Sequence, residues 1–305
     1  MPAEYGVLVV DKPTRCTSHD VVGRARKDRG LRRVGHAGTL DPDASGVLVL
    51  GLGPATRLLG YLSGADKDYE TTIVLGCATT TDDAAGDVIA RANAAGIGLR
   101  EVSDVAARLT GDILQRPSAV SAVKVSGKRA YDRVRSGEQV VLEPRPVHVE
   151  RFEVLDIAPV GDDPSLAAVR ARVTCSAGTY VRALARDLGA DLGVGGHVRS
   201  LRRTRSGAFT ASEAVGFDAI AGAPLVSAAE AARRSLPWAE VSPEDVALIR
   251  NGVRVAWPGP DGPEEEDRDS PEEVTAFALL CGDDLAAVAR RAEGRAHYLA
   301  VFPPP

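Results

Sequence analysis

An aspartate, Asp41, stands out as a residue placed to do chemistry. It lies in GHAGTLDPDASG at residues 35–46, after a glycine-punctuated turn and before a long apolar run, and Pro42 fixes the backbone just behind it. A carboxylate presented in this way can act as a nucleophile in covalent catalysis. An aspartate before a proline can also simply form a turn, because its side chain bonds the backbone two residues on. The spacing by itself leaves both interpretations open.

Other familiar chemistries lack their residue patterns. The stretch GLGPATR at 51–57 begins like a phosphate-binding loop, but it lacks the third glycine of a dinucleotide site and the G-K-[ST] of a P-loop. No G-x-S-x-G elbow is present, and no serine or cysteine stands in a recognisable nucleophile context with a histidine. The five histidines show no H-x-x-x-H spacing, and the four cysteines form no C-x-x-C pair. We therefore expect no cofactor, no metal and no disulfide.

The formal net charge of −5 is unevenly distributed along the chain. Residues 258–273 hold eight acidic residues and one basic residue, which leaves 36 Lys+Arg against 34 Asp+Glu elsewhere. Residues 116–145 hold seven basic residues against three acidic ones, and residues 178–205 hold six arginines against two aspartates. Such clusters neutralise phosphates in nucleic-acid complexes, although any single cluster can be an ordinary solvated face.

Length and composition predict a globular protein. A chain of 305 residues with 44% hydrophobic residues can form one large domain and a smaller one. The first residues carry no basic leader followed by an apolar core, and no later apolar run is long enough to cross a bilayer. We therefore expect a cytoplasmic protein with no membrane partner.

Hydrophobic periodicity predicts an α+β main domain. Ser18 is expected to cap a helix that ends near Gly30, and residues 179–193 form an amphipathic helix. Strands are predicted at residues 6–13, 46–53, 68–76, 145–157, 165–178 and 197–210. The strands do not alternate regularly with helices, which favours a mixed, largely antiparallel sheet flanked by helices over a doubly wound one.

Composition also predicts how the chain divides into domains. Residues 1–236 form the main domain, from which a basic insertion at about 118–146 departs through a proline-broken turn and a short helix. Residues 237–305 form a small C-terminal β domain, interrupted by the acidic linker 258–273, whose composition predicts disorder.

Several sequence blocks spread over residues 6–210 resemble those of a known family. They are VLVVDKP…TSHDVV, RRVGHAGTLDPDASGVLVLGLGPATRLL, DKDYETTIVLGCATTTDDAAGD, QRPSAVSAVKVSGKRAY and CSAGTYVRALARDLG…GGHVRSLRRTRSGAF. Together they are similar to bacterial tRNA pseudouridine-55 synthases of the TruB family, and the GHAGTLDP block is highly specific. The resemblance implies the pseudouridine synthase fold, with a PUA-like C-terminal domain that matches only loosely.

The resemblance also implies the residues of the active site. Asp41 matches the nucleophile, Arg182 the arginine that pairs with it, and Tyr69 a tyrosine that stacks on the uracil and assists proton removal from carbon 5. Family positions that contact the target nucleotide are occupied by His36, Tyr180 and Leu201. Because chemistry on a base within folded RNA requires the nucleotide to leave its stack, the resemblance implies base flipping.

The implied substrate is the T-arm stem-loop of tRNA, modified at uridine 55 without a cofactor and without an obligatory protein partner. The basic insertion would close over this stem-loop. Its candidate phosphate contacts, together with one from the second basic cluster, are Lys124, Lys128, Arg129, Arg133, Arg135 and Arg202. One departure concerns Arg15 in KPTRCTS, where the family usually has glycine, and it predicts a turn that avoids a glycine-only conformation.

Two alternative functions compete with this interpretation. The first is a non-catalytic RNA-binding or tRNA-folding protein on the same scaffold, which the joint presence of Asp41, Tyr69 and Arg182 disfavours. The second is a guide-RNA-dependent pseudouridine synthase, which would need protein partners. The bacterial-looking insertion and the short C-terminal part disfavour that second alternative.

Overall fold

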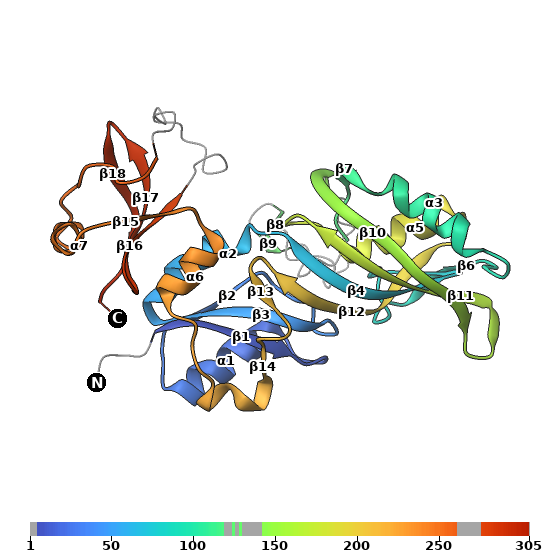
Figure 1. Cartoon of the computed structure of the whole chain (residues 1–305). Helices are drawn as coiled ribbons and strands as arrows, with labels where there is room; N and C mark the ends of the chain where they lie inside the picture. The colour runs from blue at the N-terminus through green and yellow to red at the C-terminus, as the bar shows by residue number, and fades with distance from the viewer. Residues whose placement is uncertain (1–4, 119–123, 126–127, 130–141, 261–275, 305) are drawn as a thin grey trace. The chain divides into compact units, whose positions relative to one another are not determined.

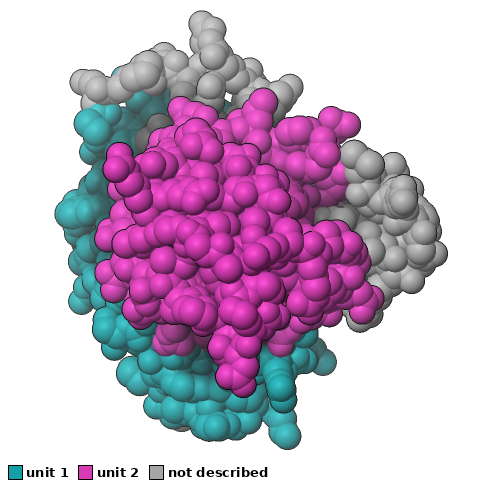
Figure 2. Space-filling model, turned by 90° about the vertical axis from the view of Figure 1, so that its right-hand side faces the viewer, with its two compact units in different colours: residues 1–42, 46–65, 206–305 teal, residues 43–45, 66–205 magenta. Residues whose placement is uncertain are grey.

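The computed structural model of the chain describes residues 5–118, 124–125, 128–129, 142–260 and 276–304 (Figure 1). The chain divides into two compact units, shown in separate colours in Figure 2. Unit 1 comprises residues 1–42, 46–65 and 206–305, and unit 2 comprises residues 43–45 and 66–205.

The sheet of unit 1 is built on two apolar strands. β1 (Gly6–Lys12) and β3 (Ser45–Leu52) pair antiparallel over the whole of β1. β14 (Val215–Gly216) runs parallel to β1, and β2 (Val34–Ala37) pairs antiparallel with β3. A further short strand of this unit is β13 (Phe209–Thr210).

Because side chains alternate along a strand, β1 and β3 supply two separate cores. Leu8 and Leu50 lie in a cluster with residues of α1 (Ser18–Arg29) and η2 (Phe217–Gly222). Val7 and Val49 lie in a second cluster on the opposite face. That cluster includes residues of η1 (Gly53–Leu58), α2 (Leu59–Ser63) and α6 (Ala228–Ser235).

The C-terminal part of unit 1 folds into a four-stranded sheet. Its strand order is β15 (Trp238–Glu240), β16 (Phe277–Cys281), β17 (Asp284–Ala292) and β18 (Arg295–Val301). β15 and β16 pair parallel, and the other two pairs are antiparallel. α7 (Pro243–Arg250) precedes β16 and begins at the cap Ser242. The prediction of a small C-terminal β domain is confirmed. Val288 and Phe302 of this part enter the same cluster as Val7, so the small sheet shares a core with β1.

The sheet of unit 2 contains the longest strands of the described chain. Its order is β12 (Gly196–Ser206), β4 (Lys67–Leu75), β11 (Asp163–Cys175), β10 (Arg145–Val160) and β7 (Gly111–Gln115). The pairs β4–β11, β11–β10 and β10–β7 are all antiparallel. Figure 1 shows β10 and β11 as one long hairpin, with α3 (Leu99–Arg108) and α5 (Val181–Asp191) running beside each other.

Two small hairpins complete unit 2. β5 (Cys77–Thr79) and β6 (Val88–Arg91) pair around residues 79–87, which we call the acidic loop. β8 (Lys124–Val125) pairs with β9 (Lys128–Arg129) inside the predicted insertion. The prediction of an α+β fold with a mixed, largely antiparallel sheet is confirmed. The short basic helix predicted in the insertion and most of the acidic linker lie outside the described residues, and the domain boundary at 236/237 stays a prediction.

Two local predictions at the start of the chain are wrong. The helix cap is Thr17, whose hydroxyl accepts from the Asp20 N–H at 3.0 Å while the Asp20 carboxylate accepts from the Thr17 N–H at 2.8 Å. This reciprocal capping box outcompetes a cap by Ser18, whose hydroxyl is used elsewhere. Arg15 has φ 58°, so its turn keeps the left-handed conformation that favours glycine instead of avoiding it. The helix does end at Gly30, with φ 62°.

No helix among the described residues combines the length and apolar character needed to cross a membrane. In the same residues, no group of three or more His, Cys, Asp or Glu side chains is arranged to hold a metal ion. All four cysteines are free thiols, and Cys77 and Cys175 are buried.

Candidate active site

Asp41 lies in a turn of unit 1, at residues 38–42, that we call the aspartate turn. Gly38 has φ 91°, a backbone conformation that side chains disfavour, so the turn requires glycine there. Leu40, just before Asp41, is fixed through both of its main-chain groups by one buried hydroxyl. The Leu40 N–H donates to Ser18 Oγ at 2.9 Å, and Ser18 Oγ donates to the Leu40 carbonyl at 3.1 Å.

The residue after Asp41 is fixed by a buried lysine. The Lys12 side chain is fully buried, and its ammonium donates to the carbonyl of Pro42 at 3.1 Å. The same ammonium donates to the carbonyls of Pro13 and Cys16, and the Cys16 N–H also donates to the Pro42 carbonyl at 3.3 Å. Hydrogen bonds to a charged donor are among the stronger ones. The partly exposed Asp41 is therefore held from both sides by residues of the preceding strand and helix.

His36, the other predicted site residue of unit 1, lies on β2 opposite Leu50 of β3. Its ring packs edge-on against the exposed His19 of α1, with centroids 5.7 Å apart and ring planes at 82°.

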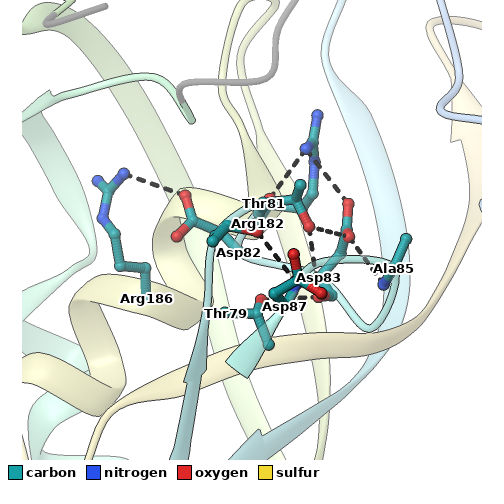
Figure 3. A network of polar contacts seen from close by, with 9 residues as sticks. Thr79, Thr81, Asp82, Asp83, Ala85, Asp87, Arg182 and Arg186 are labelled. Atoms are coloured by element: carbon teal, nitrogen blue, oxygen red, sulfur yellow. Dashed lines mark hydrogen bonds and ion pairs between the residues drawn. The ribbon is translucent and has the colours of Figure 1, made fainter. Parts of the chain in front are cut away.

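Arg182 of unit 2 is a buried arginine in the first turn of α5. Its residue is 5% exposed, which rules out an ordinary surface arginine on a helix. Its Nη1 donates to the carbonyl of Thr81 at 3.0 Å and forms an ion pair with Asp83 Oδ2 at 3.3 Å (Figure 3). A buried guanidinium needs such partners because its charge has left water. Two residues of the acidic loop, Thr81 and Asp83, therefore hold the Arg182 side chain.

The acidic loop is itself closely tied together. The Thr79 hydroxyl donates to the Asp83 carbonyl at 2.7 Å, and the Ala85 N–H donates to the Asp83 carboxylate at 3.1 Å. The Thr81 hydroxyl also donates to that carboxylate. A Cβ at Gly86 would lie 2.7 Å from the Thr81 backbone nitrogen, so only glycine fits there. On sequence grounds these residues appeared only within a family-type block and this role was not predicted, although two adjacent aspartates among small residues were a visible signal.

The two predicted tyrosines of unit 2 are positioned differently, one by strand pairing and one by a side-chain amide. Tyr69 is 8% exposed and lies on β4, in register with Val173 of β11. Tyr180 precedes α5, and the amide of the buried Gln115 holds both of its main-chain groups. Gln115 Oε1 accepts from the Tyr180 N–H at 2.8 Å, and Gln115 Nε2 donates to the Tyr180 carbonyl at 3.1 Å. Gln115 was not predicted.

The remaining predicted residues lie on β12 or in the predicted insertion. Leu201 and Arg202 lie on β12 and are partly exposed. Lys124, Lys128 and Arg129 belong to the β8–β9 hairpin. Arg133 and Arg135 lie outside the described residues.

A second buried lysine starts β4, near Tyr69. Lys67 is 6% exposed, and burial, reinforced by the charge of Arg203, lowers its pKa to about 8. Its register partner on β11 is Cys175, and burial raises the pKa of that thiol to about 11. Next to Lys67, the Asp68 carboxylate accepts from Arg205 Nε at 2.7 Å and from Arg205 Nη2 at 2.8 Å. None of these partners was predicted from the sequence.

Comparisons with known sequences match two family models in succession along the chain. Residues 26–181 match the N-terminal domain of the TruB family pseudouridylate synthases, and residues 182–248 match the tRNA pseudouridylate synthase B C-terminal domain. The tRNA pseudouridine synthase B of Cutibacterium acnes is 51% identical over 287 residues, covering 93% of this chain and 92% of that protein. The tRNA pseudouridine synthase B of Arthrobacter sp. (strain FB24) is 46% identical over 301 residues, or 98% of this chain and 97% of that protein.

Solved structures share the fold at lower identity. A chain in the structure of an H/ACA RNP bound to a substrate RNA containing 2'-deoxyuridine has a TM-score of 0.73 and 25% identity, covering 99% of this chain and 86% of that chain. A chain of a Cbf5-Nop10-Gar1 complex has a TM-score of 0.74 and 27% identity, with the same coverage.

Fold and sequence together define the class as pseudouridine synthase, so the predicted fold and the predicted isomerase activity are confirmed. Within that class the chain belongs to the TruB family. Neither the non-catalytic alternative nor the guide-RNA-dependent alternative is favoured, because relatives at about half identity are named tRNA pseudouridine synthase B.

Proposed function

We propose that this chain converts uridine 55 in the T-arm of tRNA to pseudouridine, with Asp41 as the nucleophile. The observation that carries the proposal is the 51% identity over 93% of the chain to a protein named tRNA pseudouridine synthase B. Because this substrate class is cytoplasmic, we also propose that the protein acts in the cytoplasm.

The reaction is an isomerisation and needs no redox step. The bond from ribose carbon 1′ to N1 of uracil breaks, the base rotates, and carbon 1′ bonds to carbon 5. The proton on carbon 5 is removed and N1 gains one, so atoms and electrons balance. Asp41 holds the open sugar or base as a covalent partner while the base turns. The main chain of its neighbours, Leu40 and Pro42, is fixed by hydrogen bonds. This supports the role, because a nucleophile must stay oriented toward the atom that it attacks.

Two residues of unit 2 have proposed roles around Asp41. Arg182 supplies the cation that balances the Asp41 carboxylate under a flipped base, where burial would otherwise favour the protonated acid. The buried position of Arg182 and its fixation by Thr81 and Asp83 support this role. Tyr69 stacks on the uracil and assists proton removal from carbon 5.

The proposed RNA contacts fall into two kinds. His36, Tyr180 and Leu201 contact the flipped nucleotide and the gap that it leaves. The phosphate contacts proposed are Lys124, Lys128, Arg129, Arg133, Arg135 and Arg202. Residues 1–236 form the proposed catalytic domain, with the insertion at about 118–146, and residues 237–305 form the small β domain.

The decisive experiment uses purified protein and an unmodified tRNA transcript. Chemical mapping of pseudouridine is expected to show modification at the T-loop uridine, without added RNA or protein. A transcript carrying cytidine at that position is the control and should stay unmodified. Absence of pseudouridine in the T-loop of the first transcript would contradict the proposal.

A second experiment tests the phosphate contacts. Replacing Lys124, Lys128 and Arg129 together with glutamine should weaken tRNA binding and make the slope of log K against log salt less steep, since fewer counterions are released. Binding with an unchanged salt slope would remove the assignment.

A further inference from the structure

Two arginines one helical turn apart on α5 meet two consecutive aspartates of the acidic loop (Figure 3). Arg182 pairs with Asp83 at 3.3 Å, and Arg186 Nη1 pairs with Asp82 Oδ2, also at 3.3 Å. Residues four apart on a helix lie on the same face, so one face of α5 faces the acidic loop with both cations. The mechanism proposed above uses only the first of them.

Arg186 makes more contacts than a surface ion pair requires. Its Nε donates to Asp187 at 2.9 Å, and its Nη2 donates to the carbonyl of Arg116 at 2.8 Å. β7 ends at Gln115, the residue that holds the main chain of Tyr180, and Arg116 is the next residue. One guanidinium therefore joins α5, the acidic loop and the end of β7. The planar guanidinium has donors in a fixed fork and can bind these partners together, whereas the ammonium of a lysine could bind only some of them.

Asp82 occupies a position that needs external support. Its φ is 59°, a left-handed conformation that is strained for most residues other than glycine and that Asp and Asn adopt more readily, and its side chain is 13% exposed. Burial raises the pKa of this carboxyl, and the nearby Ser118 hydroxyl and the charges of Arg186 and Arg182 act in the opposite direction. The Asp82 carbonyl accepts from the Val198 N–H at 3.0 Å, so the strained residue also fixes where the loop meets β12.

We infer that Arg186 is a positioning residue for catalysis, which holds the acidic loop so that Thr81 and Asp83 keep the Arg182 guanidinium in place. The inference rests on the proposed function, because it gives Arg182 a catalytic role. Arg186 reaches Arg182 through the Asp82–Asp83 peptide unit, and a displacement of about 1 Å at a catalytic group can slow a reaction substantially.

The experiment compares variants of the full-length protein acting on an unmodified tRNA transcript. The variants are Arg186→Gln, Arg186→Lys, Asp82→Asn and the double variant Arg186→Gln with Asp82→Asn. Asparagine at position 82 keeps the size and tolerates the left-handed backbone. The matched control is Arg170→Gln, which removes an exposed pair with Asp156 of nearly the same length, 3.2 Å.

Single-turnover rates and tRNA dissociation constants separate positioning from binding. Arg186→Gln and Asp82→Asn are each expected to slow the single turnover about tenfold with little change in tRNA affinity. The double variant should be no slower than either single variant, because both substitutions remove the same Arg186–Asp82 ion pair. Arg186→Lys should recover part of the rate, and Arg170→Gln should match the unchanged protein.

Hydrogen exchange supplies a readout that does not depend on activity. Arg186→Gln should raise amide exchange within residues 79–87 and leave residues 99–108 of α3 unchanged. Equal increases in both segments, or a rate within about twofold of the unchanged protein, would overturn the inference. If Arg186→Gln does not fold, Asp82→Asn gives the same test from the other side of the pair. If the unchanged protein does not modify tRNA, the proposed function fails, and the exchange result alone then decides whether Arg186 holds the loop.

Discussion

The aspartate turn and the acidic loop both hold one charged residue in place, but they do so by different means. Beside Asp41, the Lys12 ammonium donates to the Pro42 carbonyl, and the Ser18 hydroxyl bonds both main-chain groups of Leu40. Around Arg182, the partners are a carboxylate and a carbonyl of the acidic loop. The first arrangement fixes the main chain on both sides of Asp41, whereas the second compensates the charge of a buried guanidinium, and the two should respond differently to substitution.

The first test of this comparison removes the charge that the aspartate turn presents. Asp41→Asn should lower the rate of pseudouridine formation about a thousandfold or more, because an amide is a poor nucleophile, while the thermal midpoint stays nearly unchanged. Pseudouridine mapping and thermal unfolding measure the two effects. Asp43→Asn, an exposed neighbour, is the control and should keep full activity. An active Asp41→Asn protein would end the proposed role of the turn.

The second test removes the support of the turn instead of its charge. Lys12→Met should lower the free energy of unfolding by about 3 kcal/mol, because the carbonyls of Pro13, Cys16 and Pro42 lose a buried donor. Urea unfolding measures the loss. Lys27→Met, an exposed lysine of α1, should change stability little. A loss no larger in Lys12→Met than in this control would show that the turn does not depend on the ammonium.

The third test weakens the acidic loop at its contact with Arg182. Asp83→Asn should slow single-turnover pseudouridine formation about a hundredfold, because an uncharged amide leaves a buried guanidinium poorly balanced. Asp87→Asn in the same loop is exposed and should retain its rate. Equal rates for the two variants would mean that the carboxylate of Asp83 is not what holds Arg182.

The fourth test concerns Lys67, the buried lysine of unit 2. The folded-state pKa of Lys67, about 8, is below its usual value of 10.5, so the unfolded chain binds more protons between these values and stability rises with pH there. This group should add about 2 kcal/mol to the free energy of unfolding between pH 7.5 and 9.5. Lys67→Met should lose that rise and Lys27→Met should keep it, as measured by urea unfolding at the two pH values. An identical pH dependence in both variants would contradict the lowered pKa.

The smallest expected effect is at Arg15. This residue precedes Cys16, whose N–H donates to the Pro42 carbonyl of the aspartate turn. Arg15→Gly should raise the free energy of unfolding by up to about 1 kcal/mol, because glycine adopts φ 58° without steric cost. Arg100→Gly, at an exposed position of α3 with ordinary helical geometry, should lower it by a similar amount. A destabilised Arg15→Gly protein would show that the arginine side chain, not the backbone, matters at this turn.

Hydrophobic periodicity predicted the long strands, α5 and the type of sheet, because alternation and helical spacing depend only on nearby residues. Tyr69, Thr71 and Ile73 alternate along β4 and are all buried. Short elements such as β2 and β15 were missed, since four-residue and three-residue segments carry too little periodicity to detect. The cap at Thr17 was misplaced by one residue because serine is in isolation the more preferred N-cap residue of the two.

By itself, the sequence indicated the class of reaction through its resemblance to the TruB family, and it placed Asp41 at a turn because the glycine and proline of GHAGTLDP act on their own backbone. Only the tertiary structure decided what holds the charged groups. Asp83 lies 99 positions from Arg182, and Gln115 lies 65 positions from Tyr180. Such pairings follow from how strands and helices pack across the chain, and no local pattern records which carboxylate meets which guanidinium.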